Sequence, residues 1–93
     1  MNKSNHLAFL NNRSHAIFNQ IVTSYLETGT AVGSAKISQT RGGDFSSATI
    51  RSIMAELENA GLLYQPHISA GHIPTHSGLR LFVDVTLHKD VEF

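Results

Sequence analysis

The stretch SSATIRS (46–52) is small, hydroxylated and basic, and these properties together suit contact with DNA. If it lies on a helix whose inward stripe begins at Ile50, Ala48 and Ser52 lie on the opposite side and Arg51 lies on one shoulder. Small side chains let a helix backbone approach base edges closely, and an arginine can bind guanine or a phosphate through two hydrogen bonds. The stretch therefore predicts a helical surface that reads DNA.

Hydroxyls at the start of this segment allow two interpretations. Ser46, Ser47 and Thr49 offer short hydroxyls beside free first-turn amides, an arrangement that suits a phosphate oxygen. Either serine could instead cap the helix, and a cap is compatible with a phosphate contact. Ser34 is expected to start and cap a second helical segment, and Lys36 behind it is a candidate for phosphate contacts that do not depend on base sequence.

Positive charge is scarce, because seven Lys and Arg are balanced by seven Asp and Glu. A DNA-binding surface must therefore come from the distribution of charge and not from its total. The cations expected in the DNA-facing half are Lys36, Arg41, Arg51 and Arg80. Four cations neutralise only a few phosphates, so one chain should bind weakly and salt should release it readily. The alternative is a solvated surface of mixed charge without a nucleic-acid partner.

Both prolines of the chain, Pro66 and Pro74, bracket the segment PHISAGHIP. Proline cannot donate to a strand ladder, so the two arms are predicted to be short or edge strands of a small hairpin. The tip between them consists of small residues that could approach a sugar-phosphate backbone. The candidate contacts in this segment are His67, Ser69, Gly71 and His72.

Histidines raise a metal-binding alternative, because His67, His72 and His76 follow one another closely. The first two are expected on opposite arms of the hairpin and the third at a helix start. No Cys or Glu lies nearby in the sequence to complete a zinc shell. No Ser-His-Asp grouping, carboxylate pair or glycine-rich phosphate loop is apparent either. We therefore expect no metal, no cofactor and no enzymatic activity.

The length of 93 residues suggests one domain, and the lack of cysteine excludes disulfides and thiolate zinc sites. The apolar run from Leu7 to Leu10 is too short for a signal-peptide core or a membrane span, so a cytoplasmic location is expected. Residues 1–12 are expected to form a flexible N-terminal arm.

Two helices are predicted in the first half of the chain. The first starts near residue 13 and stops at Gly29. Its inward stripe is Ile17, Phe18, Ile21, Val22 and Tyr25. The second has about two turns from Ser34, with Ala35 and Ile37 to bury, before Gly42 and Gly43 break it.

A third helix is predicted between Ser46 or Ser47 and Gly61, and a fourth after the hairpin, capped by Thr75. The inward residues of the third are Ile50, Ile53, Met54 and Leu57. Those of the fourth are Leu79, Phe82 and Val83, although Leu81, Val83, Val85 and Leu87 also alternate as a strand would.

The predicted fold class is mainly α with a small β-hairpin. Helix, short helix, helix, hairpin and helix is the order of a winged helix-turn-helix domain, with a three-helix core, a wing and a C-terminal helix. The fold is common in DNA binding, but the fold alone does not establish function.

Three stretches resemble the family of the heat-inducible transcription repressor HrcA: TSYLETGTAVGS (23–34), SSATIRSIMAELENAGLLYQPHISAGHIPT (46–75) and SGLRLFVD (77–84). They cover most of residues 13–84, the expected DNA-binding domain. The resemblance implies a bacterial repressor of chaperone and heat-shock operons that binds an inverted-repeat operator, called CIRCE, as a homodimer. It also implies the chaperonin as a modulator and a place at the nucleoid.

By position in the resemblance, SSATIRS corresponds to the recognition helix of the family and PHISAGHIP to its wing. His72 stands where the family usually has arginine, and Ser52 where it usually has asparagine. Histidine is largely neutral at pH 7, so a weaker or pH-dependent wing contact is expected. The long C-terminal part associated with dimerisation is missing, so 85–93 are expected to be a truncated linker to it. The alternative is a protein-interaction module or a truncated paralogue with weakened DNA binding.

Overall fold

Four helices and a two-stranded hairpin make up the part of the chain that the structure describes. This structure is a computed structural model that describes residues 11–68 and 70–91, with side chains as far as residue 86. The elements are α2 (Asn12–Thr28), α3 (Ser34–Thr40), α4 (Ser47–Asn59), β1 (Leu63–Tyr64), β2 (Ile73–Pro74) and α5 (His76–Val91). The predicted order of elements and the fold class are therefore confirmed.

Helix α2 crosses the middle of the molecule and begins and ends at local signals. The Asn11 side chain accepts a hydrogen bond from the Ser14 amide at 2.8 Å, and Gly29 ends the helix in the left-handed region with φ 72°. The expected stripe is buried: Ile17, Phe18, Ile21 and Val22, with Tyr25 packed partly against it. The predicted arm over 1–12 falls mostly outside the described residues, and the helix already includes its last residue.

Helix α3 corrects two expectations. Its N-cap is Gly33 and not Ser34, and no side chain bonds to the cap. Ile37 is buried as predicted, but Ala35 is exposed. Val32, which lies just before the helix, is 1% exposed and belongs to the core, which the sequence did not predict.

Helix α4 is capped by Ser46, which resolves the choice between the two serines. The Ser46 hydroxyl accepts a hydrogen bond from the Thr49 amide at 3.1 Å. The predicted inward residues are all buried: Ile50, Ile53, Met54 and Leu57. Gly61 follows the helix with φ 79°, a conformation that glycine adopts without strain.

Ser46→Ala should lower the free energy of unfolding by about 1 kcal/mol, because it leaves the Thr49 amide without its side-chain acceptor. Ser47→Ala is the matched control, since Ser47 is already inside the helix and alanine favours helices. Urea unfolding followed by circular dichroism measures both variants. Equal losses for the two variants would contradict the assignment of the cap.

The hairpin pairs Leu63 with Pro74 and Tyr64 with Ile73 in antiparallel register. Each strand has only two residues, as the prolines predicted. A further bridge joins His72 to Val32, with backbone N–O distances of 2.8 and 2.9 Å. The segment before α3 therefore adds a third extended piece beside the hairpin, which the sequence did not predict.

Helix α5 is continuous through its described length, so the strand alternative is not adopted. Thr75 caps it as predicted, because its hydroxyl accepts from the Gly78 amide at 3.0 Å. The prediction that Val83 faces inward is wrong: Val83 is 49% exposed, whereas Leu81 is 5% exposed. The helical rotation that buries Leu81 turns Val83, two residues later, outward. The proposed boundary after residue 84 falls within this helix, and residues 92–93 lie outside the described residues.

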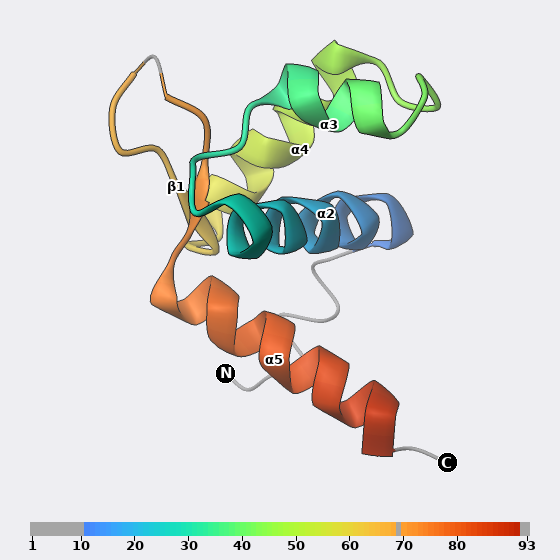
Figure 1. Cartoon of the computed structure of the whole chain (residues 1–93), viewed down its shortest axis with the longest axis vertical. Helices are drawn as coiled ribbons and strands as arrows, with labels where there is room; N and C mark the ends of the chain where they lie inside the picture. The colour runs from blue at the N-terminus through green and yellow to red at the C-terminus, as the bar shows by residue number, and fades with distance from the viewer. Residues whose placement is uncertain (1–10, 69, 92–93) are drawn as a thin grey trace.

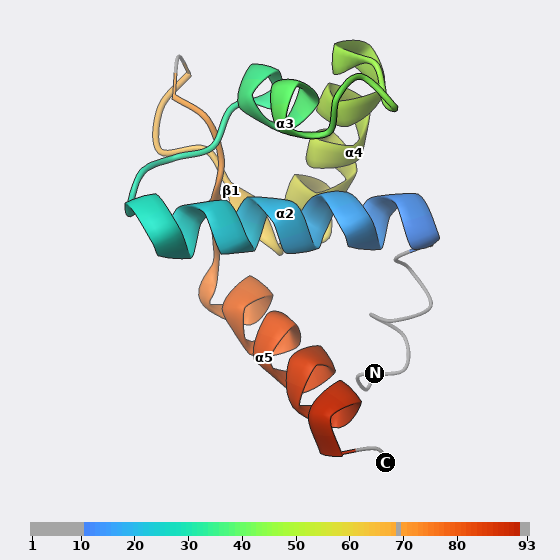
Figure 2. The same cartoon turned by 45° about the vertical axis from the view of Figure 1, so that its right-hand side comes forward.

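The helices divide the molecule into two sides. Helices α3 and α4 and the hairpin loop lie on one side of α2, and α5 lies on the other, as Figure 1 and Figure 2 show. The buried apolar residues form one cluster to which α2, α3, α4, the hairpin and α5 all contribute. Among the described residues, no helix is long and apolar enough to cross a membrane.

Candidate nucleic-acid interface

The outer face of α4 is exposed and consists mostly of small side chains. Ala48, Ser52, Ala55 and Asn59 are exposed opposite the buried stripe, and Arg51 is exposed on one shoulder. Nothing larger than asparagine lies along the centre of this face. A flat surface of this kind can approach a nucleic-acid groove closely, with Arg51 placed to reach bases or phosphates.

The hydroxyls at the start of α4 have separate roles. Ser46 both accepts from the Thr49 amide and donates to Thr49 Oγ1 at 3.0 Å. Its hydrogen-bonding capacity is therefore largely used within the cap. The Thr49 hydroxyl receives that hydrogen bond and keeps its own hydrogen for an outside acceptor. Ser47, the first residue of the helix, is half-buried.

The hairpin loop is held by hydrogen bonds across its width. The Gln65 side-chain amide donates to the Ala70 carbonyl at 2.8 Å, and the Ala70 amide donates to the His67 carbonyl at 3.0 Å. Ile68 projects from the loop and is 93% exposed. His67 is exposed, and Ser69 lies outside the described residues. These hydrogen bonds hold the described part of the loop in place and leave Ile68 available for contact with another molecule.

His72 faces α4 instead of projecting from the loop. Its Nε2 lies 3.1 Å from Oε1 of Glu58, and its side chain is 13% exposed. Beside it, Gly71 lies against the backbone of Val32 and Gly33, so closely that a Cβ atom would overlap both. The hairpin loop is therefore tied by a side chain to α4 and by its backbone to the segment before α3.

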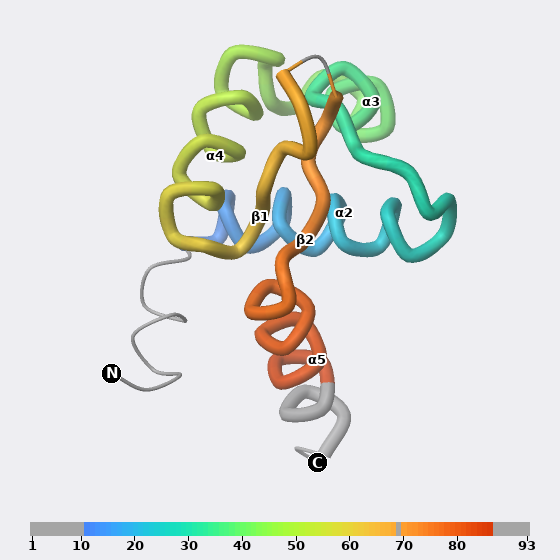
Figure 3. The backbone as a smooth tube through the Cα atoms, turned by 90° about the vertical axis from the view of Figure 1, so that its left-hand side faces the viewer, coloured from blue at the N-terminus to red at the C-terminus, as the bar shows by residue number. Residues whose placement is uncertain are grey.

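The hairpin loop and the start of α4 lie at the same end of the molecule. Figure 1, Figure 2 and Figure 3 all show the hairpin loop, α3 and the start of α4 on the same side of α2. Arg51 and Glu58 are seven residues apart, about two turns, so they share one flank of α4. Since Glu58 contacts His72, Arg51 lies on the flank that faces the hairpin.

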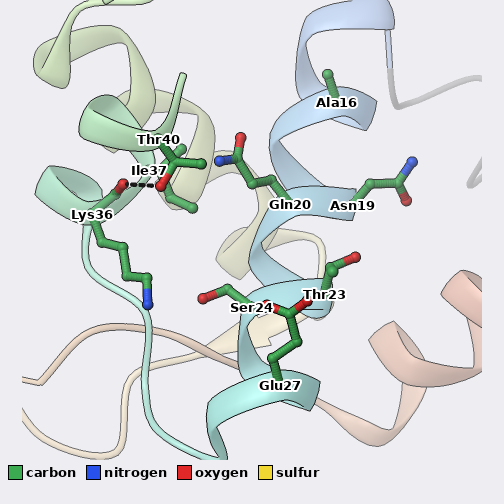
Figure 4. A pocket seen from close by; sticks show the side chains of 9 residues that line it. All are labelled: Ala16, Asn19, Gln20, Thr23, Ser24, Glu27, Lys36, Ile37 and Thr40. Atoms are coloured by element: carbon green, nitrogen blue, oxygen red, sulfur yellow. Dashed lines mark hydrogen bonds between the residues drawn. The ribbon is translucent and has the colours of Figure 1, made fainter. Parts of the chain in front are cut away.

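Two residues predicted for the interface lie on α3. Ser34 is half-buried in the first turn, and Lys36 is exposed. Lys36 lines a groove of about 390 Å³ between α2 and α3, together with Glu27 on α2. Figure 4 shows the Lys36 side chain extending toward this groove. No residue of α4 lines it, so Lys36 is not gathered with the outer face of α4.

Two other cations have different surroundings from those expected. Arg80 is exposed on α5, which lies across α2 from the start of α4 and the hairpin loop, so the structure does not bring it together with the other candidates (Figure 2). Arg41 is bound by both carboxylate oxygens of Asp44 at 3.0 and 3.1 Å, and it donates to Gln20 at 3.2 Å. Its charge is thereby largely neutralised within the protein.

Arg13 is a cation that the sequence reasoning missed. It lies in the first turn of α2, where it lines a groove of about 210 Å³ against the flank of α4. The lining residues are Asn11, Arg13, Thr49, Ser52, Ile53 and Glu56. An arginine at a solvated helix start has no local signal that separates it from ordinary surface charge, and only the packing of α2 on α4 brings it here.

The metal-binding alternative receives no support from the described residues. Among them, no group of three or more His, Cys, Asp or Glu is placed to hold a metal ion.

Comparisons with known proteins point to one kind of relative. No protein-family model matches the chain. The heat-inducible transcription repressor HrcA of Bradyrhizobium sp. (strain ORS 278) is 54% identical over 81 residues, which are 87% of this chain and 22% of the repressor. HrcA of Bartonella tribocorum is 51% identical over 80 residues, 86% of this chain and 22% of that protein. The chain thus spans about a fifth of the length of these relatives.

A solved structure shares both fold and sequence. The crystal structure of a hypothetical protein matches 90% of this chain and 26% of its own, with a TM-score of 0.82 and 42% identity. The three stretches that resemble the repressor family (23–34, 46–75 and 77–84), the winged helix-turn-helix fold and the relatives all indicate the same kind of protein. This chain is related, over most of its length, to the N-terminal part of the heat-inducible transcription repressor HrcA.

Proposed function

We propose that this chain binds duplex DNA in a sequence-specific manner, as the DNA-reading domain of a transcriptional repressor of heat-induced genes. The observation that carries the proposal is the outer face of α4, which is small, hydroxylated and marked by one arginine. This face belongs to a domain whose relatives are named transcription repressors. The role is one of binding and not of catalysis.

The geometry supports α4 as the helix that enters the major groove. Ala48 and Ala55 leave room for the backbone to approach base edges, and Arg51 offers the bidentate donor that guanine accepts. The Thr49 hydroxyl and the first-turn amides suit a phosphate. The hairpin loop lies at the same end of the molecule, where it can follow the adjacent backbone (Figure 3).

The proposal includes binding to DNA as a homodimer. A two-fold dimer on an inverted repeat would double the few phosphate contacts of one chain, and the two symmetric half-sites would match the two domains. Modulation by a chaperonin and a cytoplasmic location at the nucleoid are part of the proposal because the resemblance to the repressor family implies them.

Binding to an inverted-repeat operator of the CIRCE type should exceed binding to a scrambled duplex of equal composition. One changed base pair under α4 should weaken binding about tenfold or more. If a two-fold dimer makes about four cation–phosphate contacts, raising salt from 50 to 200 mM should lower the affinity on the order of a hundredfold. Fluorescence anisotropy with labelled duplexes measures these quantities.

The two duplexes also test the proposal against its rivals. Equal affinity for operator and scrambled DNA would contradict sequence-specific reading, and no binding by the folded domain at 50 mM salt would contradict DNA binding altogether.

A protein-interaction module is the second candidate, and the observation that favours it is Ile68. Ile68 is 93% exposed on a loop that hydrogen bonds hold in place, so its apolar side chain is available to a protein partner. Ile68→Ser distinguishes the candidates. If the loop serves DNA, the affinity for operator changes while the domain stays folded; if it serves only a protein partner, the affinity for DNA is unaltered.

A further inference from the structure

The start of α2 packs beside the flank of α4 that faces away from the hairpin. Thr49 and Ser52 of α4 line the groove that Arg13 also lines, whereas Arg51 and Glu58 lie on the opposite flank, toward His72. The outer face of α4 is therefore bordered by a cation on each side. One border is Arg51 with the hairpin loop, and the other is Arg13.

Arg13 differs from the nearby Arg41 in how its charge is used. The Arg13 guanidinium lies 5.4 Å from the centre of the Phe45 ring, and that of Arg41 lies 4.7 Å from the same ring. Asp44 pairs with Arg41 through both oxygens, but Arg13 has no carboxylate partner within the described part of the chain. Phe45 thus supports the Arg13 side chain without neutralising its charge.

The groove beside Arg13 contains donors for an anion. The Thr49 hydroxyl keeps its hydrogen, because Ser46 donates to its oxygen, and the Ser52 hydroxyl is exposed. Glu56 is the one carboxylate that lines this groove, and it lies about one turn further along α4 than Ser52. An anion therefore fits at the Arg13 and Thr49 end.

We propose that Arg13 binds a backbone phosphate of duplex DNA, on the strand opposite the one that the hairpin loop follows, with the Thr49 hydroxyl as second donor. This inference rests on the proposed function. A helix in the major groove has a phosphate backbone on either side, and the start of α2 lies beside the flank of α4 that faces away from the hairpin. Arg13 and the hairpin loop together would hold α4 between the two strands.

The test measures how the affinity for random-sequence duplex DNA depends on salt. Arg13→Gln should lower the affinity about tenfold at 50 mM salt, the size of one charge-assisted contact. It should also reduce the slope of log affinity against log salt by about 0.9 for each bound chain, because one phosphate contact is lost. Arg13→Lys should keep most of the slope, since the charge remains.

Thr86→Glu is the matched control. It changes the net charge by the same one unit at an exposed position of α5, across α2 from the start of α4. Its affinity should stay within about twofold of the wild type and its slope should be unchanged, because the added charge lies beyond the range of unscreened interactions and no phosphate contact is lost. Equal effects of Arg13→Gln and Thr86→Glu would overturn the inference. An unchanged slope in Arg13→Gln would also overturn it and would reduce Arg13 to a packing role on Phe45.

Random-sequence DNA separates this inference from the proposed function. Wild-type protein that binds duplex DNA without preferring the operator contradicts the repressor proposal, and the comparison of slopes still decides the role of Arg13. Wild-type protein that binds no duplex at 50 mM salt contradicts both.

Discussion

Gly71→Ala should lower the free energy of unfolding by about 2–3 kcal/mol, the usual cost of inserting atoms into a close-packed contact. A Cβ atom at Gly71 would overlap the backbone of Val32 and Gly33, and backbone cannot move aside as the end of a flexible side chain can. Relief of the overlap requires the bridge between Val32 and His72 to open. We therefore also expect weaker DNA binding, because the hairpin loop loses one of its two attachments. Urea unfolding and anisotropy measure the two effects.

Gly33→Ala is the control for this prediction. Gly33 lies on the facing segment, has extended backbone with φ −95°, and has nothing within 4 Å of the position of an added Cβ. Its replacement should change stability by less than about 0.5 kcal/mol, because reduced unfolded-state entropy offsets a slightly poorer N-cap. If Gly71→Ala were as mild as Gly33→Ala, the close approach of the hairpin to the Val32 backbone would be wrong.

Arg51→Ala should cost about 1–3 kcal/mol of binding free energy on the operator and should relax specificity at one base pair. Arg51 is exposed on the flank of α4 that faces the hairpin, and it has no hydrogen-bond or ion-pair partner among the described residues. Its removal should leave the fold intact. Anisotropy against a panel of operators with single base changes measures both the affinity and the position at which discrimination is lost.

Lys36→Ala separates base reading from phosphate binding. Lys36 is a candidate for sequence-independent contacts, so its loss should weaken operator and scrambled DNA about equally. Lys36 lines the groove between α2 and α3, away from the outer face of α4. We therefore expect Lys36→Ala to lower the affinity for the operator less than Arg51→Ala does. If Arg51→Ala and Lys36→Ala weakened all sequences alike, Arg51 would bind a phosphate and not a base.

The secondary structure was largely predictable because its signals are local. The buried stripes of α2 and α4 follow the helical period, and Gly29, Ser46 or Ser47, and Thr75 mark ends within a few residues. Errors arose where neighbours in space compete for the core. Ala35 is exposed while Val32 is buried, and Val83 is exposed because α5 turns Leu81 inward.

The candidate site was only partly predictable. The outer face of α4 follows from helical period alone, so Ala48, Arg51 and Ser52 are exposed as expected. The surroundings of the cations depend on how helices pack across long separations in the chain. That packing places Arg13 beside α4 and leaves Arg80 across α2.

The sequence alone predicted the order of elements, the buried stripes, the outer face of α4 and the short hairpin between two prolines. Periodicity, caps and the missing amide hydrogen of proline act within a few residues of the chain, so a sequence displays them directly. The tertiary structure decided that His72 faces Glu58, that Gly71 rests on the Val32 backbone, and that Arg13 borders α4. These relations depend on the distances between packed elements, which no local pattern of residues specifies.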